Sequence, residues 1–388
     1  MQIIGPNTPG KLNLSFFLSK GENNFDLIRL IAATTVIFGH VLWVKRIPEP
    51  IFSITGIEPA SSIGVYAFFL LSGILVTQSF VRRDAPFAWV IARLARVLPG
   101  LLVCTTLTAF VIGALVTNKS LVEYFTDDST YAWWLHASTL FGGLLPWLPG
   151  VFQPLHTAVV NVPLWTLPIE LKCYLIVLAL GVFGLLRTRA RAISAVVVVM
   201  AAFLFLHFNA LNIYFINDML SIQHGYKLPI APFFFVGMAA YILRDRIQLY
   251  GSVATMLAGL YLICAHTNLR YVTFFAAMVY GILWLATTPM LRKITIRHDY
   301  SYGLYIYGFV VQQCLDFWFP SMGAAALMSS TLAVTILIAA ASWHCIEKPA
   351  IRWARRLSNA ADSQEAVRSH RASPERSGHD TIGRHGGR

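Results

Sequence analysis

The sequence predicts an all-α fold: a polytopic membrane helical bundle with about ten transmembrane helices and both termini in the cytoplasm. Of its 388 residues, 56% are hydrophobic and only 12% are charged, whereas a soluble domain carries about 25% charged residues. The mean hydropathy is +0.62. Apolar runs of about 20 residues, the length of a membrane-spanning helix, recur from Leu27 to Cys345. Runs of this length favour helices over a membrane barrel, whose strands need only about 10 alternating residues.

The apolar runs give the order of the predicted elements. The spans lie near residues 26–45, 61–80, 97–117, 164–186, 191–208, 227–243, 249–265, 270–288, 301–319 and 324–345. The sixth, "LPIAPFFFVGMAAYIL", is short and interrupted by proline, so the count is fixed only to within one span. No internal repeat is evident, which disfavours a transporter built from inverted repeats.

The connections between spans alternate between rich and poor in lysine and arginine, and cytoplasmic loops carry the excess. The rich connections hold Lys11, Lys20, Arg82, Arg83, Arg93, Arg96, Arg187, Arg189, Arg191, Arg244, Arg246, Arg292, Lys293, Arg297, Arg352, Arg355 and Arg356. The poor connections hold Lys45, Arg46, Lys119, Lys227 and Arg270. Since the rich set includes both ends of the chain, both termini are predicted to be cytoplasmic, which requires an even number of spans.

Composition also argues against several classes of function. The net charge is +12, but the basic residues lie between apolar runs and not on one soluble face, so no nucleic acid partner is expected. No removable signal peptide is expected, because the first apolar run follows a mostly polar segment and lacks a cleavage site. The cysteines are scattered without metal-ligand spacing, so we expect inert thiols and no metal: Cys104, Cys173, Cys264, Cys314 and Cys345.

Three segments are expected along the chain. Residues 1–23 form a cytoplasmic N-terminal segment, 24–353 the transmembrane domain, and 354–388 a disordered, basic cytoplasmic tail. The arginines of the tail either contact anionic membrane lipid or only keep the tail soluble. The loop 118–163 is rich in tryptophan and proline, so we expect it to fold against the external mouth of the bundle.

The first span, "FDLIRLIAATTVIFGH", carries Asp26, Arg29 and His40. Arg29 and His40 are 11 residues apart, which places them about 20° apart around a helix and roughly 16 Å apart along it. Asp26 lies one turn before Arg29 and is expected to pair with it. Polar residues in a membrane helix usually face a cavity or a partner. The alternative is that Arg29 extends to the interface and His40 is a hydrogen-bonded core residue.

A buried carboxylate is predicted in the fourth span, "NVPLWTLPIELKCY", where Glu170 lies about two turns in from the external side. This depth is comparable to that of His40, so the two side chains are candidates for an acid–base pair. Lys172 is a weaker candidate partner for Glu170, because residues two apart do not face each other on a helix.

Other candidate residues lie within the second span and just after it. Ser72 and Gly73 in "FFLLSGILVTQSF" are small residues that favour close helix packing; a catalytic serine is the alternative. The absence of a G-x-S-x-G elbow excludes a hydrolase-type nucleophile. Arg93 and Arg96, with Arg82 and Arg83 nearby, predict either a basic mouth for the phosphates of a ligand or simply a cytoplasmic loop.

The last span ends in "SWHCIEKPAIRW". Pro349 is expected to stop the helix at the membrane edge. Glu347 is expected to have a structural role, pairing with Arg352 or with a basic loop.

In order and spacing, these motifs resemble membrane acyltransferase family 3, the bacterial integral-membrane O-acyltransferases. The resemblance includes Arg29 and His40 at Arg-x10-His spacing, "FFLLSG", "ARLARVLP", "LWTLPIE" ending at Glu170, "SYGLYIYG" and the closing "IEKP". It covers residues 24–353. The stretch "LPGVFQPLHTAVVNVPLWTLPIE" is most similar to members that modify surface polysaccharides or other glycans.

The resemblance implies a multi-pass protein of the bacterial inner membrane that transfers an acyl group, commonly acetyl, from cytoplasmic acyl-CoA to an external hydroxyl. Arg93, Arg96 and Arg29 are expected to bind coenzyme A, whose phosphates are anionic. His40 is expected to act as general base or to accept the acyl group, with Glu170 orienting its imidazole. Asp26, Ser72 and Glu347 are expected to support the site.

Two alternatives from other classes remain at this point. A secondary transporter or flippase also uses intramembrane arginine, glutamate and histidine, but predicts internal symmetry. A non-catalytic member that binds a glycan or lipid does not need both His40 and Glu170. The sequence does not identify the acceptor, which is a glycan or a lipid-linked saccharide in this interpretation, nor the length of the acyl group or the oligomeric state.

Overall fold

The computed structural model describes residues 13–18, 22–83, 85–140, 145–208, 219, 227–294 and 296–358. Within these ranges the chain is helical, and extended pairing is limited to two isolated bridges, Asn13 with Gln248 and Thr117 with Val151. The predicted all-α fold is therefore confirmed for this part of the chain. Most of the predicted N-terminal segment, and the predicted tail from residue 359 onward, lie outside the described residues.

The helices follow the predicted order of apolar runs. They are α1 (Leu14–Phe17), α2 (Phe25–Val44), α3 (Pro50–Thr55), α4 (Ala60–Arg83), α5 (Pro86–Leu107), a π-turn (Thr108–Ile112), α6 (Gly113–Val116), α7 (Leu121–Thr126), α8 (Asp128–Thr139), α9 (Thr166–Val182), α10 (Arg189–Phe208), α12 (Ala231–Ile242), α13 (Gly251–Cys264), α14 (Arg270–Thr287), α15 (Ser301–Trp318) and α16 (Ala324–Ser342), followed by a second π-turn (Trp343–Glu347).

Seven helical segments of the described chain are long and apolar enough to cross a membrane. They are Phe25–Val44, Ala60–Arg83, Pro86–Val116, Val162–Val182, Arg189–Leu206, Arg270–Thr287 and Ala324–Ser358. The other three predicted spans coincide with α12 and α13, which are shorter, and with α15, whose glutamines and aspartate make it less apolar. A polytopic membrane bundle is thus supported, whereas the count of ten and the cytoplasmic termini stay predictions.

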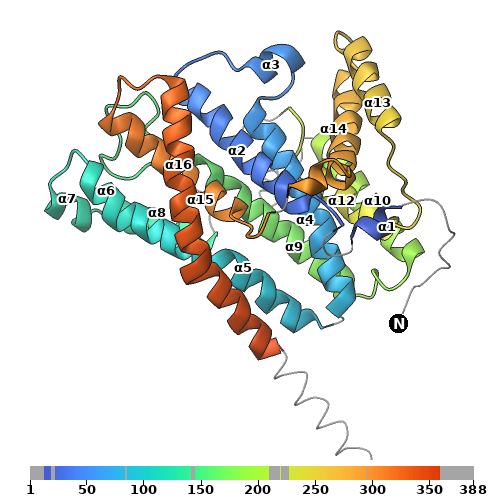
Figure 1. Ribbon diagram of the computed structural model, residues 1–388. Coiled ribbons are helices and arrows are strands. Elements are labelled where there is room, and N and C mark those ends of the chain that lie inside the picture. The colour runs from blue at the N-terminus through green and yellow to red at the C-terminus, as the bar shows by residue number, and fades with distance from the viewer. Residues whose placement is uncertain are drawn as a thin grey trace, which may run out of the picture.

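Helices α2 and α4 run side by side through the middle of the bundle, and α16 crosses its front (Figure 1). Helix α4 also packs closely on α12, and two glycines make this approach possible. A Cβ atom on Gly73 would lie 2.0 Å from the carbonyl oxygen of Phe234, and one on Gly237 would lie 2.1 Å from that of Leu70. Larger residues at either position would force the helices apart, so Gly73 serves packing as its small size predicted.

The third membrane segment begins earlier than predicted, at Pro86 and not near residue 97. Proline is favoured in the first turn of a helix, because its missing N–H has no partner to lose there. The consequence is functional: Arg93 and Arg96 lie on α5, inside the bundle wall, and not in a connecting loop.

The last helix does not stop at Pro349, as predicted, but continues to Ser358. The π-turn Trp343–Glu347 precedes the proline, and within it the N–H of Lys348 donates to the carbonyl of Trp343. This shift in the hydrogen-bond ladder accommodates the ring of Pro349, which lacks an N–H, without ending the helix. The predicted tail from residue 354 therefore begins as helix.

The described parts of the loop 118–163, residues 118–140 and 145–163, are folded, in agreement with the prediction from its tryptophans and prolines. A capping box of Ser120 and Glu123 starts α7. The side-chain amide of Gln313 on α15 donates to the carbonyls of Thr157 (2.6 Å) and Val159 (2.8 Å). These contacts fix the chain that leads into α9, which carries Glu170.

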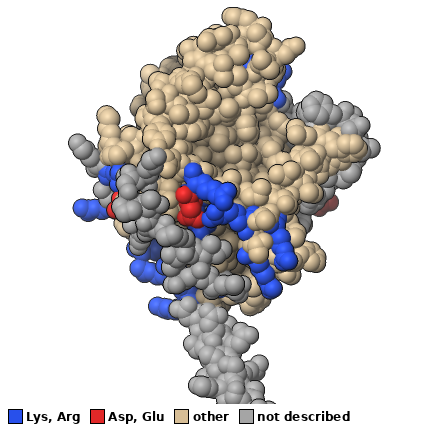
Figure 2. All heavy atoms as spheres, turned by 90° about the vertical axis from the view of Figure 1, so that its right-hand side faces the viewer, with Lys and Arg blue, Asp and Glu red and all other residues tan. Residues whose placement is uncertain are grey.

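The molecule has one end rich in arginine and lysine, which we call the basic end. It is the lower end in Figure 1, where α16 leaves the bundle, and it holds Arg83, Arg352 and Arg355. On the face shown in Figure 2, Lys and Arg side chains likewise gather toward the lower half. At the opposite end, Lys45 and Asp316 form an ion pair of 2.5 Å that joins the ends of α2 and α15.

Candidate active site

Two adjoining cavities occupy the basic end of the bundle. The outer cavity has a volume of about 600 Å³, and its charged lining residues are Arg29, Arg83, Arg93, Arg96, Asp299, Lys348, Arg352 and Arg355. The inner pocket is smaller, about 90 Å³, and lies between α2, α4, α5, α9 and α15. Arg29, Arg93 and Arg96 line both cavities, so they form the neck between them.

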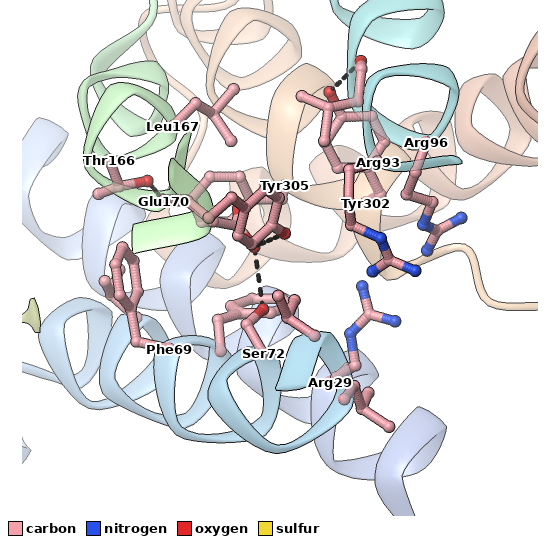
Figure 3. Close-up of a pocket in the computed structure, with 16 residues that line it drawn as sticks. Arg29, Phe69, Ser72, Arg93, Arg96, Thr166, Leu167, Glu170, Tyr302 and Tyr305 are labelled. Carbon is pink, nitrogen blue, oxygen red and sulfur yellow. Dashed lines mark hydrogen bonds between the residues drawn. The ribbon is translucent and has the colours of Figure 1, made fainter. Parts of the chain in front are cut away.

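Glu170 lies in the inner pocket together with Ser72 (Figure 3). Its Oε1 accepts hydrogen bonds from the hydroxyl of Ser72 (2.9 Å) and from that of Tyr174 (2.5 Å). Helix α9 supplies Glu170 and Tyr174, and α4 supplies Ser72. Since Gly73 faces α12, its neighbour Ser72 turns toward the pocket, and the Ser-Gly pair has both a packing and a site role.

The three arginines of the neck point toward one another (Figure 3), which requires compensation of their charge. Asp299, just before α15, forms ion pairs with Arg29 and, at 2.6 Å, with Arg96. Arg96 also lies 3.7 Å from the carboxylate of Glu347. Such an arrangement holds two cations side by side and satisfies the shared carboxylate between them.

Asp299 stays ionised in this setting. Burial by itself would raise the pKa of Asp299, but the guanidinium groups of Arg29 and Arg96 and the hydrogen bonds from Ser301 outweigh it and lower the pKa to about 2. Sequence reasoning missed this residue. The available signal was an aspartate placed two positions before Ser301, at the start of a predicted span, where it accepts hydrogen bonds from the backbone N–H and hydroxyl of Ser301.

The structure changes two predicted pairings. Within the described residues, no ion pair shorter than 4 Å joins Asp26 to Arg29, and Arg29 pairs instead with Asp299, just before α15. Glu347 is buried and accepts a hydrogen bond from the hydroxyl of Ser342 (3.0 Å). The two predicted partners were Arg352 and a basic loop, but the nearby cation is Arg96, which lies on α5.

Arg93 differs from its neighbours in the neck. Among the described residues, its guanidinium makes one long hydrogen bond of 3.4 Å, to the hydroxyl of Ser79, and its Nε is buried without a partner. No carboxylate of the described chain lies within 4 Å of it. Arg93 is therefore the neck cation most able to bind an anionic group.

His40 lies beyond the inner pocket and does not line it. Its ring packs edge-on against Phe309, with centroids 5.1 Å apart, and Phe309 is one turn beyond the pocket residue Tyr305 on α15. The Nδ1 atom is buried and makes no hydrogen bond of normal geometry with the described residues. The backbone of Val36, one turn earlier on α2, is its polar neighbour but does not provide such a bond. No contact between His40 and Glu170 occurs in the described part of the chain.

The lining chemistry points to an anionic ligand. Among the described residues, no three His, Cys, Asp or Glu side chains gather as metal ligands would. The outer cavity instead presents seven cationic side chains and one carboxylate. A carboxylate with two hydroxyl partners lies deeper, in the inner pocket, so the site joins anion binding to polar groups able to move a proton.

Comparisons with known proteins place these features in context. A family model described as an acyltransferase domain matches residues 22–344. The chain is 29% identical over 341 residues to an O-acetyl transferase of Shigella phage Sf6, covering 84% of this chain and 95% of the relative. It is 28% identical over 369 residues to nodulation protein 10 of Rhizobium leguminosarum bv. viciae, covering 87% and 96%. No solved structure shows a significant match.

Proposed function

The chain belongs to the acyltransferase 3 family, and from this premise we propose that it is a membrane O-acyltransferase that uses acyl-CoA, with acetyl-CoA as the first candidate. The acceptor is a hydroxyl of a surface or periplasmic glycan or of a lipid-linked saccharide. The protein is a multi-pass component of the bacterial inner membrane, and its basic end faces the cytoplasm.

One observation carries this proposal: a cationic neck leads from a basic cavity to a pocket that holds Glu170 and Ser72. Coenzyme A has anionic phosphates at one end and a thioester at the end of an extended arm. Arg93, Arg96 and Arg29 bind the phosphates through charge-assisted hydrogen bonds. The arm then passes through the neck and carries the thioester toward the inner pocket.

The transfer requires a base for the acceptor hydroxyl. His40 takes the hydroxyl proton as the oxygen attacks the thioester carbonyl; the carbon–sulfur bond breaks, and the departing thiolate receives the proton to give free coenzyme A. Hydrogen bonds from Ser72 and Tyr174 hold Glu170 in the inner pocket. From there its negative charge acts on His40 through space, without direct contact, and stabilises a protonated imidazole as the acceptor oxygen attacks.

The acceptor approaches from the opposite end of the bundle. This side of the site lies below the folded loop 118–163, which Gln313 and Asn161 tie to α15. The name of the phage relative supports acetyl as the transferred group. The glycan acceptor is proposed from the motifs of the chain, and a hydroxyl that reaches His40 past Phe309 would complete the path.

The experiment is an acyl-transfer assay on the purified full-length protein in lipid nanodiscs, with acetyl-CoA and a panel of cell-envelope glycans. Wild-type protein should release free coenzyme A in an acceptor-dependent manner and add one acetyl mass to the glycan. Glu170→Gln should lower kcat by roughly 100-fold or more. Asp128→Asn, which changes an exposed carboxylate on α8, is the matched control and should keep wild-type activity.

Two results would contradict the proposal. Acceptor-dependent release of coenzyme A at the wild-type rate by Glu170→Gln would remove this residue from the chemistry. Movement of an unmodified glycan across the membrane of proteoliposomes, with no release of coenzyme A, would support the transporter alternative.

A further inference from the structure

The last part of the α16 helix carries a row of basic side chains that the sequence motifs do not explain. Lys348, Arg352 and Arg355 are spaced at i, i+4 and i+7, which places them within about 60° of one another around the helix. All three line the outer cavity. We call them the α16 basic row.

The continuation of the helix past Pro349 is what brings this row to the cavity. The π-turn Trp343–Glu347 changes the helical register just before Lys348. The same turn buries Glu347 beside Arg96. It also places the ring of Trp343 against Arg96, whose Cζ lies 5.3 Å from the centroid of that ring. Local π-turns of this kind are frequent at functional sites.

The charges of the outer cavity fall into two groups. In the neck, Arg29 and Arg96 share Asp299, and no carboxylate in the described part of the chain pairs with Arg93. At the rim, no ion pair of the described chain involves the α16 basic row. Three like charges on one helix face repel one another, and a multiply charged anion bound to the row would relieve this repulsion.

We propose that the α16 basic row binds the 3′-phosphate of coenzyme A. This inference rests on the proposed function. Coenzyme A carries its phosphates in two places: a diphosphate next to the pantetheine arm and a separate phosphate on the ribose. With the arm in the inner pocket, the diphosphate reaches the neck at Arg93 and the ribose phosphate stays at the rim. The apolar side chains of Leu75, Ala92 and Ile351 also line this cavity.

The same cations also suit the phosphate of an anionic lipid headgroup, because the basic end lies at a membrane surface. The two sources differ in one respect. A headgroup subsite is indifferent to the ribose phosphate of coenzyme A, whereas the proposed subsite distinguishes coenzyme A from 3′-dephospho-coenzyme A.

The test measures the Kd of both compounds by calorimetry on the full-length protein in neutral phosphatidylcholine nanodiscs. Wild-type protein should bind coenzyme A roughly tenfold or more tightly than the dephospho compound. Arg352→Ala combined with Arg355→Ala should bind both equally, at the wild-type affinity for the dephospho compound, which also shows that the variant is folded. Arg356→Ala is the matched control, since Arg356 is exposed on the same helix and does not line the cavity. It should keep the wild-type ratio.

Each other outcome is decisive. Equal binding of both compounds by wild-type protein, or an unchanged ratio in the double variant, would overturn the phosphate subsite and leave the acyl-CoA donor in place. No binding of either compound by wild-type protein would overturn the proposed donor as well. A repeat with one-third phosphatidylglycerol should preserve the wild-type ratio. Loss of that ratio would assign the row to lipid headgroups.

Discussion

The Arg29–Asp299–Arg96 cluster of the neck and the region around His40 differ in how their buried polar groups are paired. In the neck, the charges of Arg29 and Arg96 are matched by Asp299, with Glu347 nearby. Around His40, three side chains have buried polar atoms without partners among the described residues. These atoms are Nδ1 of His40, both polar atoms of the Gln312 amide and the hydroxyl oxygen of Thr335.

This difference separates two tasks. Asp299 pairs with Arg29 and Arg96, so these two cations keep their positions whether or not an anion is bound, and only Arg93 is left for the ligand. A buried polar atom without a partner costs roughly 1–3 kcal/mol. A hydrogen bond from a ligand or a water therefore stabilises the region around His40. We therefore infer that the neck serves positioning and that the His40 region serves the reaction.

Of the substitutions that test this difference, the largest effect is expected at His40, on catalysis. His40→Ala should lower kcat by roughly 100-fold or more, because the acceptor hydroxyl loses its base, while the Kd for coenzyme A stays within about twofold of wild type. Steady-state kinetics and calorimetry on the same preparation measure both. His266→Ala, at an exposed position outside both cavities, is the control. A His40→Ala variant with normal kcat would place the base elsewhere.

The next largest effect is on stability at the neck. Asp299→Asn should lower the free energy of unfolding by about 3 kcal/mol, because it leaves Arg29 and Arg96 buried without their carboxylate. Asp245→Asn breaks the exposed pair of Arg189 and Asp245 and should cost less than about 1 kcal/mol. Thermal unfolding in detergent compares the two, and equal costs would refute the structural role assigned to Asp299.

The pH dependence of the melting temperature also tests the role of Asp299. The pKa of Asp299 is about 2 in the folded protein, below its unfolded value of about 3.9. A lowered folded pKa gives a contribution that is complete above the unfolded pKa and is lost as the pH falls toward 2. The difference in melting temperature between wild type and Asp299→Asn should therefore be constant above about pH 5 and shrink below pH 4. A difference that shrinks around pH 6 to 7 would assign the effect to another group.

The smallest effect is expected at Thr335, on the seam of α16 against α15. Its hydroxyl is buried without a partner among the described residues, and Val has nearly the same shape. Thr335→Val should leave the free energy of unfolding unchanged or raise it by about 1 kcal/mol, in contrast to Asp299→Asn. A loss of more than about 1 kcal/mol in a melting experiment would mean that this hydroxyl is satisfied in the folded protein.

The sequence predicted the helical class and the positions of the membrane segments well, because an apolar run of sufficient length has few other solutions in a bilayer. It was less accurate at helix ends. Pro86 starts a helix about ten residues before the apolar run begins, and Pro349 fails to stop one. Proline marks a boundary only through its local hydrogen-bond pattern, and the π-turn before Pro349 alters that pattern in a way that composition does not reveal.

By itself, the sequence determined which residues share a face of one helix. The period of the helix sets Arg29 and His40 on one side of α2, and the same period aligns Lys348, Arg352 and Arg355. Only the tertiary structure decided the partners across helices: Arg29 and Arg96 with Asp299, Glu170 with Ser72 and Tyr174, and His40 with Phe309. The physical reason is that periodicity is a property of each helix alone, whereas these pairings depend on how helices distant in sequence approach and rotate against one another.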